Sequence, residues 1–85
     1  MVTLNDLRVG DFSKIIELKR VGSPLEEGDE ETIRTLWRLG VIPGAELQVV
    51  AKAMGGDPIA IDTRGARLAL GKREAQLVQV EGLSK

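Results

Sequence analysis

Apolar and polar residues alternate with a period of two over much of the C-terminal half of the chain. The alternation runs through residues 45–53, 59–61, 66–70 and 78–80. Because successive side chains of a strand point to opposite faces, this period predicts four short strands, each with one buried face. Residues 63–65 are expected to form a three-residue hairpin loop in which Gly65 takes the positive-φ position.

A fifth strand is expected nearer the N-terminus. The segment FSKIIELK, which begins at Phe12, is rich in β-branched and apolar residues. Phe12, Ile16 and Leu18 share one face of this strand, and Ile15 lies on the other. Lys14 interrupts the alternation, which indicates either an edge strand or a β-bulge.

One segment repeats its apolar residues with helical spacing. In residues 30–39, Ile33, Leu36 and Trp37 fall on a single stripe. Gly40 is expected to end this helix, because glycine adopts the left-handed conformation without a Cβ penalty. The segment therefore predicts an amphipathic helix that lays its stripe on the strands.

Two other segments, residues 3–7 and 72–75, have the composition of single helical turns. Short strands of this kind cover their edges best by curling into a barrel. The sequence therefore predicts a mostly β fold, a small SH3-like barrel of about five strands with one inserted α-helix and a short N-terminal helical turn. Residues 1–85 are expected to form a single domain, with residues 82–85 as a frayed tail.

Composition limits what holds such a small domain together. The 85 residues include no cysteine and no histidine, so neither disulfides nor Cys/His metal ligation contributes. Hydrophobic residues make up 42% of the chain, yet Phe12 and Trp37 are its only aromatic residues. The core must therefore be packed from Leu, Ile, Val and Ala.

The charge balance bears on the partner class. Twelve basic and thirteen acidic residues give a net charge of −1, whereas nucleic-acid binders usually carry a basic excess. Four basic residues could gather near one hairpin, but single-strand binding also needs aromatic platforms, which these strands lack. The four basic residues are Arg64, Arg67, Lys72 and Arg73. We therefore expect no nucleic-acid partner.

The N-terminal sequence MVTLNDLRVGD has no positive region followed by an apolar one, so a signal peptide is not expected. No apolar run approaches the roughly 20 residues that span a bilayer. These features predict a cytoplasmic protein without direct membrane insertion.

Little in the chain suggests catalysis. Without histidine and cysteine, the common general bases and soft metal ligands are missing, so we expect no enzyme, no cofactor and no tight iron or zinc site. The acidic residues 26–31 could bind a hard cation weakly. Their spacing does not match a calcium loop, however, and a solvated loop before a helix is the simpler interpretation.

Trp37 is the most informative single residue. At its spacing a tryptophan belongs to the core more often than to a binding surface, but an exposed ring would be an anchor for a partner. Leu25, Val41 and Ile42 could extend an apolar patch around it. We therefore take Leu25, Trp37, Val41 and Ile42 as the expected partner-contact residues.

Five short patterns occur in a fixed order along the chain. They are LxDLxxG at residues 4–10, LxxLGxxPG at 36–44, GGDPI at 55–59, RGxxLxL at 64–70 and KxEAxxVxV at 72–80. In this order and spacing they resemble the ferrous iron transport protein A family, FeoA, over nearly the whole chain. The resemblance gives turn-forming roles to Gly40, Pro43, Gly44, Gly56, Asp57, Pro58 and Gly65. The acidic stretch 23–31 is longer and more charged than the family pattern.

The resemblance implies an SH3-like barrel that assists Fe²⁺ uptake by contacting FeoB, a membrane permease with a cytosolic GTP-binding domain. A similar barrel forms the C-terminal module of metal-dependent repressors, so a stand-alone interaction or regulatory module is the alternative. The absence of DNA-binding and dimerisation domains disfavours a free repressor. Weak self-association stays open.

Overall fold

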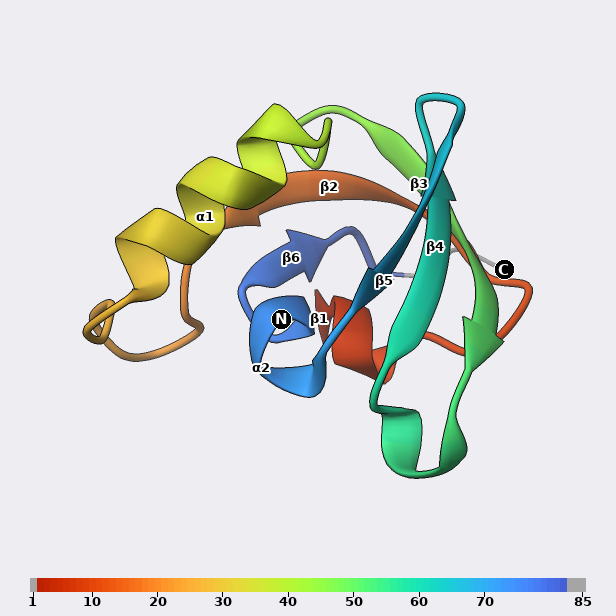
Figure 1. The fold of residues 1–85 in the computed structure, drawn as a ribbon, viewed down its shortest axis with the longest axis horizontal. Helices are drawn as coiled ribbons and strands as arrows, with labels where there is room; N and C mark the ends of the chain where they lie inside the picture. Colours follow the sequence, from red (N-terminus) through yellow and green to blue (C-terminus); the bar gives the residue numbers. More distant parts are fainter. Residues whose placement is uncertain (1, 83–85) are drawn as a thin grey trace.

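Six antiparallel strands curl around an aliphatic core in the computed structural model, which describes residues 2–82 (Figure 1). Their order in the sheet is β1-β6-β2-β3-β4-β5. The strands are β1 (Val2–Thr3), β2 (Phe12–Leu18), β3 (Glu46–Lys52), β4 (Ile59–Thr63), β5 (Ala66–Leu70) and β6 (Val78–Val80). The helices are α1 (Asp29–Arg38) and α2 (Lys72–Ala75), with 3₁₀ turns η1 (Leu4–Asp6) and η2 (Met54–Gly56).

The mostly β fold with one main helix is confirmed, and the strand missing from the prediction is β1. Only two residues long, it pairs with β6 through Val2–Val80 and Thr3–Gln79. A strand of this length is too short to show a period of two. Gly82 follows β6 without regular structure, and residues 83–85 of the expected tail lie outside the described residues.

In strand β2 the predicted grouping of Phe12, Ile16 and Leu18 on one face, opposite Ile15, was wrong. Phe12 is 69% exposed and Ile16 is also exposed, whereas Ile15 and Leu18 are buried. The register of β2 against β6 shifts between Ile15 and Glu17, so residue 16 is a bulge that reverses the phase of the strand. The bulge alternative is therefore confirmed, while the edge alternative is wrong because β2 lies between β6 and β3.

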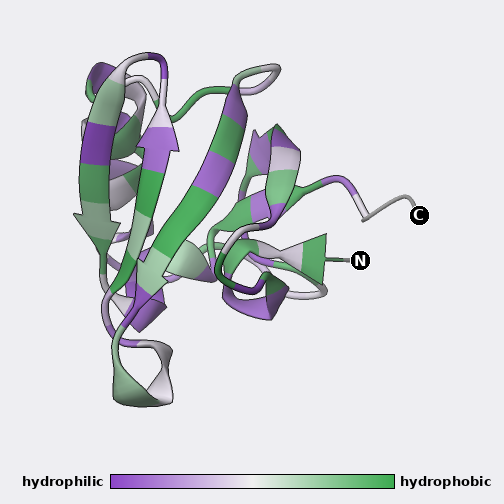
Figure 2. Cartoon of the chain, turned by 90° about the vertical axis from the view of Figure 1, so that its right-hand side faces the viewer, coloured by the Kyte–Doolittle hydropathy of each residue, from purple (hydrophilic) through white to green (hydrophobic). Residues whose placement is uncertain are grey.

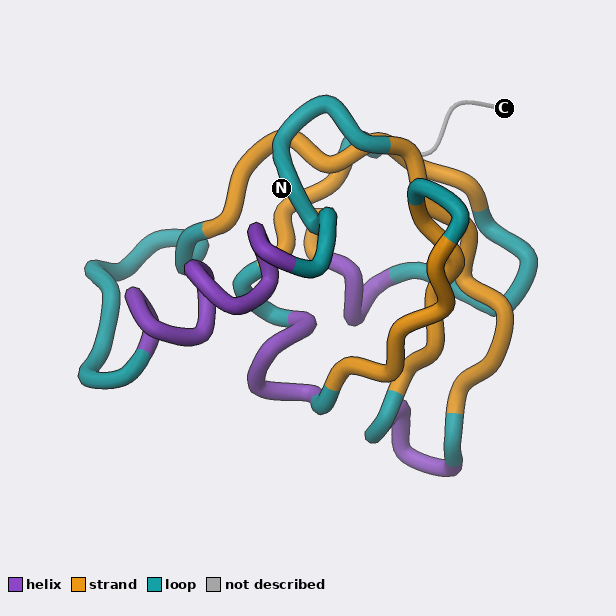
Figure 3. Tube along the Cα trace, turned by 45° about the horizontal axis from the view of Figure 1, so that its top comes forward, coloured by secondary structure: helices purple, strands orange, loops and turns teal. Residues whose placement is uncertain are grey.

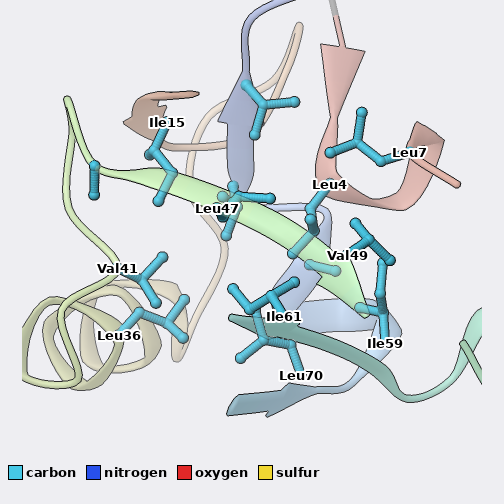
Figure 4. Packing of buried hydrophobic residues seen from close by; sticks show 14 of the residues in the cluster. Leu4, Leu7, Ile15, Leu36, Val41, Leu47, Val49, Ile59, Ile61 and Leu70 are labelled. Carbon is cyan, nitrogen blue, oxygen red and sulfur yellow. The ribbon is translucent and has the colours of Figure 1, made fainter. Parts of the chain in front are cut away.

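The C-terminal end of α1 fixes the helix to the barrel. Gly40 has a φ of +95°, the Val41 amide donates to the Leu36 carbonyl (2.9 Å), and the Gly40 amide donates to the Trp37 carbonyl (3.0 Å). These two bonds form a Schellman motif, which usually pairs two apolar side chains at its ends. Here they are Leu36 and Val41, which lie side by side in the core (Figure 4).

The hairpin between β4 and β5 is one residue tighter than predicted. Thr63 pairs with Ala66, so only Arg64 and Gly65 connect the strands. Both residues have positive φ, +50° and +81°, as a two-residue type I′ turn requires. The three-residue loop is therefore wrong, because Thr63 continues the ladder instead of entering the turn.

The N-terminal turn is attached to the sheet by a lysine. The Lys52 ammonium donates to the carbonyl oxygens of Asn5 and Leu7, at 3.1 and 2.8 Å. Leu4 and Leu7 in this N-terminal segment are fully buried.

Bands of opposite hydropathy alternate along the strands (Figure 2), and α1 lies to one side of them (Figure 3). None of the helices in residues 2–82 combines the length and apolar character that crossing a membrane requires.

Candidate functional site

An open apolar groove runs between α1 and the end of β2, and we call it the α1 groove. Trp37 and Leu25 are its most exposed apolar members, with 51% and 40% of their surfaces accessible. Leu18 of β2 and Ile33 of α1 lie deeper, and Glu30 and Arg34 border it. An exposed tryptophan beside aliphatic side chains is typical of a surface that binds another protein.

A buried ion pair shapes the loop that carries Leu25. Arg20 binds Asp29 through two hydrogen bonds, from Nε to Oδ2 at 2.6 Å and from Nη2 to Oδ1 at 3.2 Å. The Glu26 amide also donates to Asp29 Oδ2, at 2.7 Å. Asp29 is fully buried at the start of α1. The pair therefore joins both ends of the loop from which Leu25 reaches the α1 groove.

The ion pair also shifts the pKa values of Arg20 and Asp29. Hydrogen bonding to the Arg20 guanidinium lowers the pKa of Asp29 below its ordinary value of 3.8, and the Glu26 amide lowers it further. The Asp29 carboxylate in turn raises the pKa of Arg20. Both partners are thus charged at neutral pH.

This coupling predicts a pH dependence of stability. Folding lowers the pKa of Asp29, so the charged carboxylate contributes its full stabilisation at pH values above the ordinary pKa of 3.8. This stabilisation is lost as the pH falls through the lower pKa that Asp29 has in the folded protein. We expect Asp29→Asn to lower the Tm at pH 7 and to flatten the fall of Tm between about pH 4 and pH 2. Thermal melts of Glu27→Gln, an exposed carboxylate in the same loop, serve as the control. An Asp29→Asn profile parallel to the wild type would contradict this role.

The expected contact residues do not all reach the surface together. Trp37 is exposed instead of belonging to the core, because the Leu36 position next to it takes the buried side of α1. Val41 is fully buried, so the prediction that it is a partner-contact residue is wrong. Its burial follows from the Schellman contact with Leu36. Ile42 is half-buried and packs against the core, so Leu25 and Trp37 are the two that share the α1 groove.

Sequence reasoning missed two members of the groove. Ile33 lies one turn before Trp37 on the same stripe, and this spacing could have placed it beside the tryptophan. Leu18 could not be placed, because the bulge in β2 changes which side of the strand it faces.

Two of the four basic residues considered for nucleic-acid binding are bound by other parts of the chain. Arg67 binds Asp62 through two hydrogen bonds of 2.7 and 3.1 Å, and Arg73 donates to the Glu27 carbonyl before α1 (3.2 Å). Arg64 instead lies at the β4–β5 turn, where its side chain approaches Gly40. Lys72 begins α2.

The acidic stretch 26–31 is an exposed loop that leads into the first turn of α1, as predicted, except that Asp29 is buried. Its one buried carboxylate, Asp29, is already bound by Arg20. Within residues 2–82, no three acidic side chains come together as metal ligands.

This arrangement predicts weak metal binding. With oxygen ligands alone and at most paired carboxylates, anaerobic calorimetry with Fe²⁺, and separately with Zn²⁺, should give no tight stoichiometric binding. Calcium serves as the hard-cation control. Tight one-to-one binding of either transition metal would contradict this expectation.

A second open groove lies among β2, β3 and the β4–β5 turn, and we call it the strand groove. Exposed Phe12 lines it together with Leu47, Thr63 and Arg64. It offers one exposed aromatic residue, whereas the α1 groove combines a tryptophan with three aliphatic side chains.

The family model described as FeoA domain matches residues 2–82. The structure of Stenotrophomonas maltophilia FeoA complexed with zinc, described as an SH3 domain protein, has a TM-score of 0.80 and 29% identity, covering 95% of this chain and 91% of that one. A FeoA-like protein from Clostridium acetobutylicum has a TM-score of 0.78 and 31% identity over 99% and 88% of the two chains.

A manganese-dependent transcriptional repressor shares the fold at a TM-score of 0.74 and 22% identity. The match covers 96% of this chain and 41% of the repressor. The predicted SH3-like barrel is thereby confirmed.

Proposed function

The chain belongs to the FeoA family, whose domain model matches residues 2–82, and from this membership we propose that it is an accessory protein of ferrous iron uptake that works by protein contact. Its partner in this proposal is the cytosolic part of a FeoB-type GTP-binding permease. The Stenotrophomonas maltophilia relative is described as a candidate ferrous iron transport activating factor, which supports the same role here.

The observation that carries the proposal is the α1 groove. It places half-exposed Trp37 of α1 next to Leu25 of the preceding loop, and burying such aromatic anchors provides much of the free energy of protein association. The groove is small, so the contact should be of the weak, transient class. A regulatory contact with a transporter fits that class.

A second candidate is a stand-alone regulatory module related to the C-terminal domain of metal-dependent repressors. The similarity of fold to the manganese-dependent repressor favours it. In that role the barrel would bind a separate DNA-binding protein instead of a permease.

Titration calorimetry separates the two candidates. The full chain is titrated into the purified cytosolic domain of the FeoB-type permease from the same genome, with GDP and with a non-hydrolysable GTP analogue. The full-length permease in nanodiscs is tested in parallel. Saturable one-to-one binding supports the transport role, while no binding to either form in both nucleotide states would refute it.

A further inference from the structure

Three arginines around the C-terminal half of α1 form no ion pair with the part of the chain that the structure describes. Arg34 and Arg38 are exposed on α1, and Arg64 is exposed at the β4–β5 turn. The ion pairs formed within residues 2–82 involve Lys19, Arg20 and Arg67 instead. We call Arg34, Arg38 and Arg64 the arginine rim.

Two of these residues lie on one face of α1. Arg34 and Arg38 are four residues apart, a spacing at which like charges repel, and Glu30 stands at the same spacing before Arg34. The helix dipole favours the cation in the last turn, Arg38, but Arg34 lies in the middle of the helix and borders the α1 groove.

Arg64 has a backbone conformation that is unusual for arginine. It has a φ of +50° at the first position of a turn where Asn, Asp and Gly are preferred. Its stem lies against Gly40, where an added Cβ would be 3.4 Å from Arg64 Cδ. The hydrogen bonds found within residues 2–82 do not use its guanidinium donors, so the contact of its stem with Gly40 is the interaction that accompanies the strained backbone. Local conflicts of this kind concentrate at functional positions.

We infer that the arginine rim recognises carboxylates of an acidic protein segment whose apolar residue occupies the α1 groove. This inference rests on the proposed function and specifies the partner's chemistry. Guanidinium groups bind carboxylates through paired, charge-assisted hydrogen bonds. The partner segment should thus carry an apolar anchor for Trp37 and Leu25, with Asp or Glu on the side nearer Gly40.

The same helix argues against an anionic membrane as the ligand. Its N-terminal end carries exposed Glu30 and Glu31, preceded by exposed Glu26 and Glu27. These carboxylates would be repelled by anionic headgroups, and the chain has a net charge of −1. A protein segment can match acid at one end and base at the other, whereas a uniformly charged bilayer cannot.

Charge reversal tests the inference. Association rates of the permease cytosolic domain are measured for wild type and for Arg34→Glu/Arg38→Glu at low salt and at about 0.5 M salt. We expect the domain to associate with the Arg34→Glu/Arg38→Glu variant roughly tenfold more slowly than with the wild type at low salt. At high salt this difference in association rate should be largely lost. The control is Arg8→Glu/Lys14→Glu, which makes the same change in net charge at exposed positions outside the groove.

Arg64→Asn separates recognition from folding. Asparagine suits the left-handed turn position, so the Tm should stay equal or rise, while binding to the domain weakens by several-fold. If the wild type binds and the rim variants bind equally well, the inference is wrong and the proposed function stands. If the wild type does not bind, both are wrong. Binding to phosphatidylglycerol vesicles that the rim variants abolish, without an effect on the permease domain, would also overturn the inference.

Discussion

Replacing Leu36 by alanine is expected to lower the free energy of unfolding by about 3 kcal/mol. Leu36 is 1% exposed and belongs to the core cluster that joins α1 to the barrel. Its removal leaves a cavity and breaks the apolar contact with Val41 that accompanies the Schellman motif. For a domain of this size, that loss is a large part of the total stability.

Urea denaturation of wild type, Leu36→Ala and Leu39→Ala measures this effect. Leu39 provides a matched control because it is the same residue type three positions further on and is exposed. We expect its replacement to cost less than about 1 kcal/mol. Similar losses for the two variants would mean that α1 is not fixed to the barrel through Leu36.

Replacing Trp37 by alanine is expected to weaken binding to the permease domain about 30-fold, equivalent to about 2 kcal/mol. Trp37 is half exposed, so its removal should change the Tm little. Adding Leu25→Ala should weaken binding further, because both side chains line the α1 groove. Calorimetry gives the affinities and thermal melts give the Tm values.

Met54→Ala is the control for this second prediction. Met54 is 99% exposed in η2, between β3 and β4, and does not line the α1 groove. Its loss should leave affinity unchanged. If Met54→Ala weakened binding as much as Trp37→Ala, exposed hydrophobicity in general, and not the groove, would be responsible.

Elements with a clear period were predictable from the sequence. The alternation in β3 and β4 correctly placed Leu47, Val49, Ile59 and Ile61 in the core. Ala51 and Ala53, in the same phase as Leu47, are exposed beyond a register shift between Val49 and Ala51. The stripe and the glycine after it located α1, whose observed start at Asp29 is one residue earlier than predicted. These features depend on local spacing, which a single sequence shows directly.

Features that depend on pairing between distant segments were not predictable. The bulge in β2 is defined by its partner strand β6, 60 residues or more along the chain, so the exposure of Phe12 and Ile16 could not be foreseen. The burial of Asp29 depends on Arg20, which lies across a loop with no pattern of its own.

The candidate site was predicted in part for the same reason. Trp37 and Leu25 were expected as contact residues, and both line the α1 groove. Val41 was wrongly expected at the contact surface, because the sequence pattern of an apolar residue after a glycine cap fits both an exposed patch and a buried Schellman contact. Only the three-dimensional packing against Leu36 decides between them.

An NMR titration tests the docking surface most directly. Unlabelled permease cytosolic domain is added to the ¹⁵N-labelled full chain, and amide and indole signals are followed. We expect the signals of the Trp37 indole and of the amides around Leu25 and Ile33 to shift or broaden first. Perturbations confined to the strand groove around Phe12 and Thr63, or none at a concentration that saturates the calorimetric signal, would contradict it.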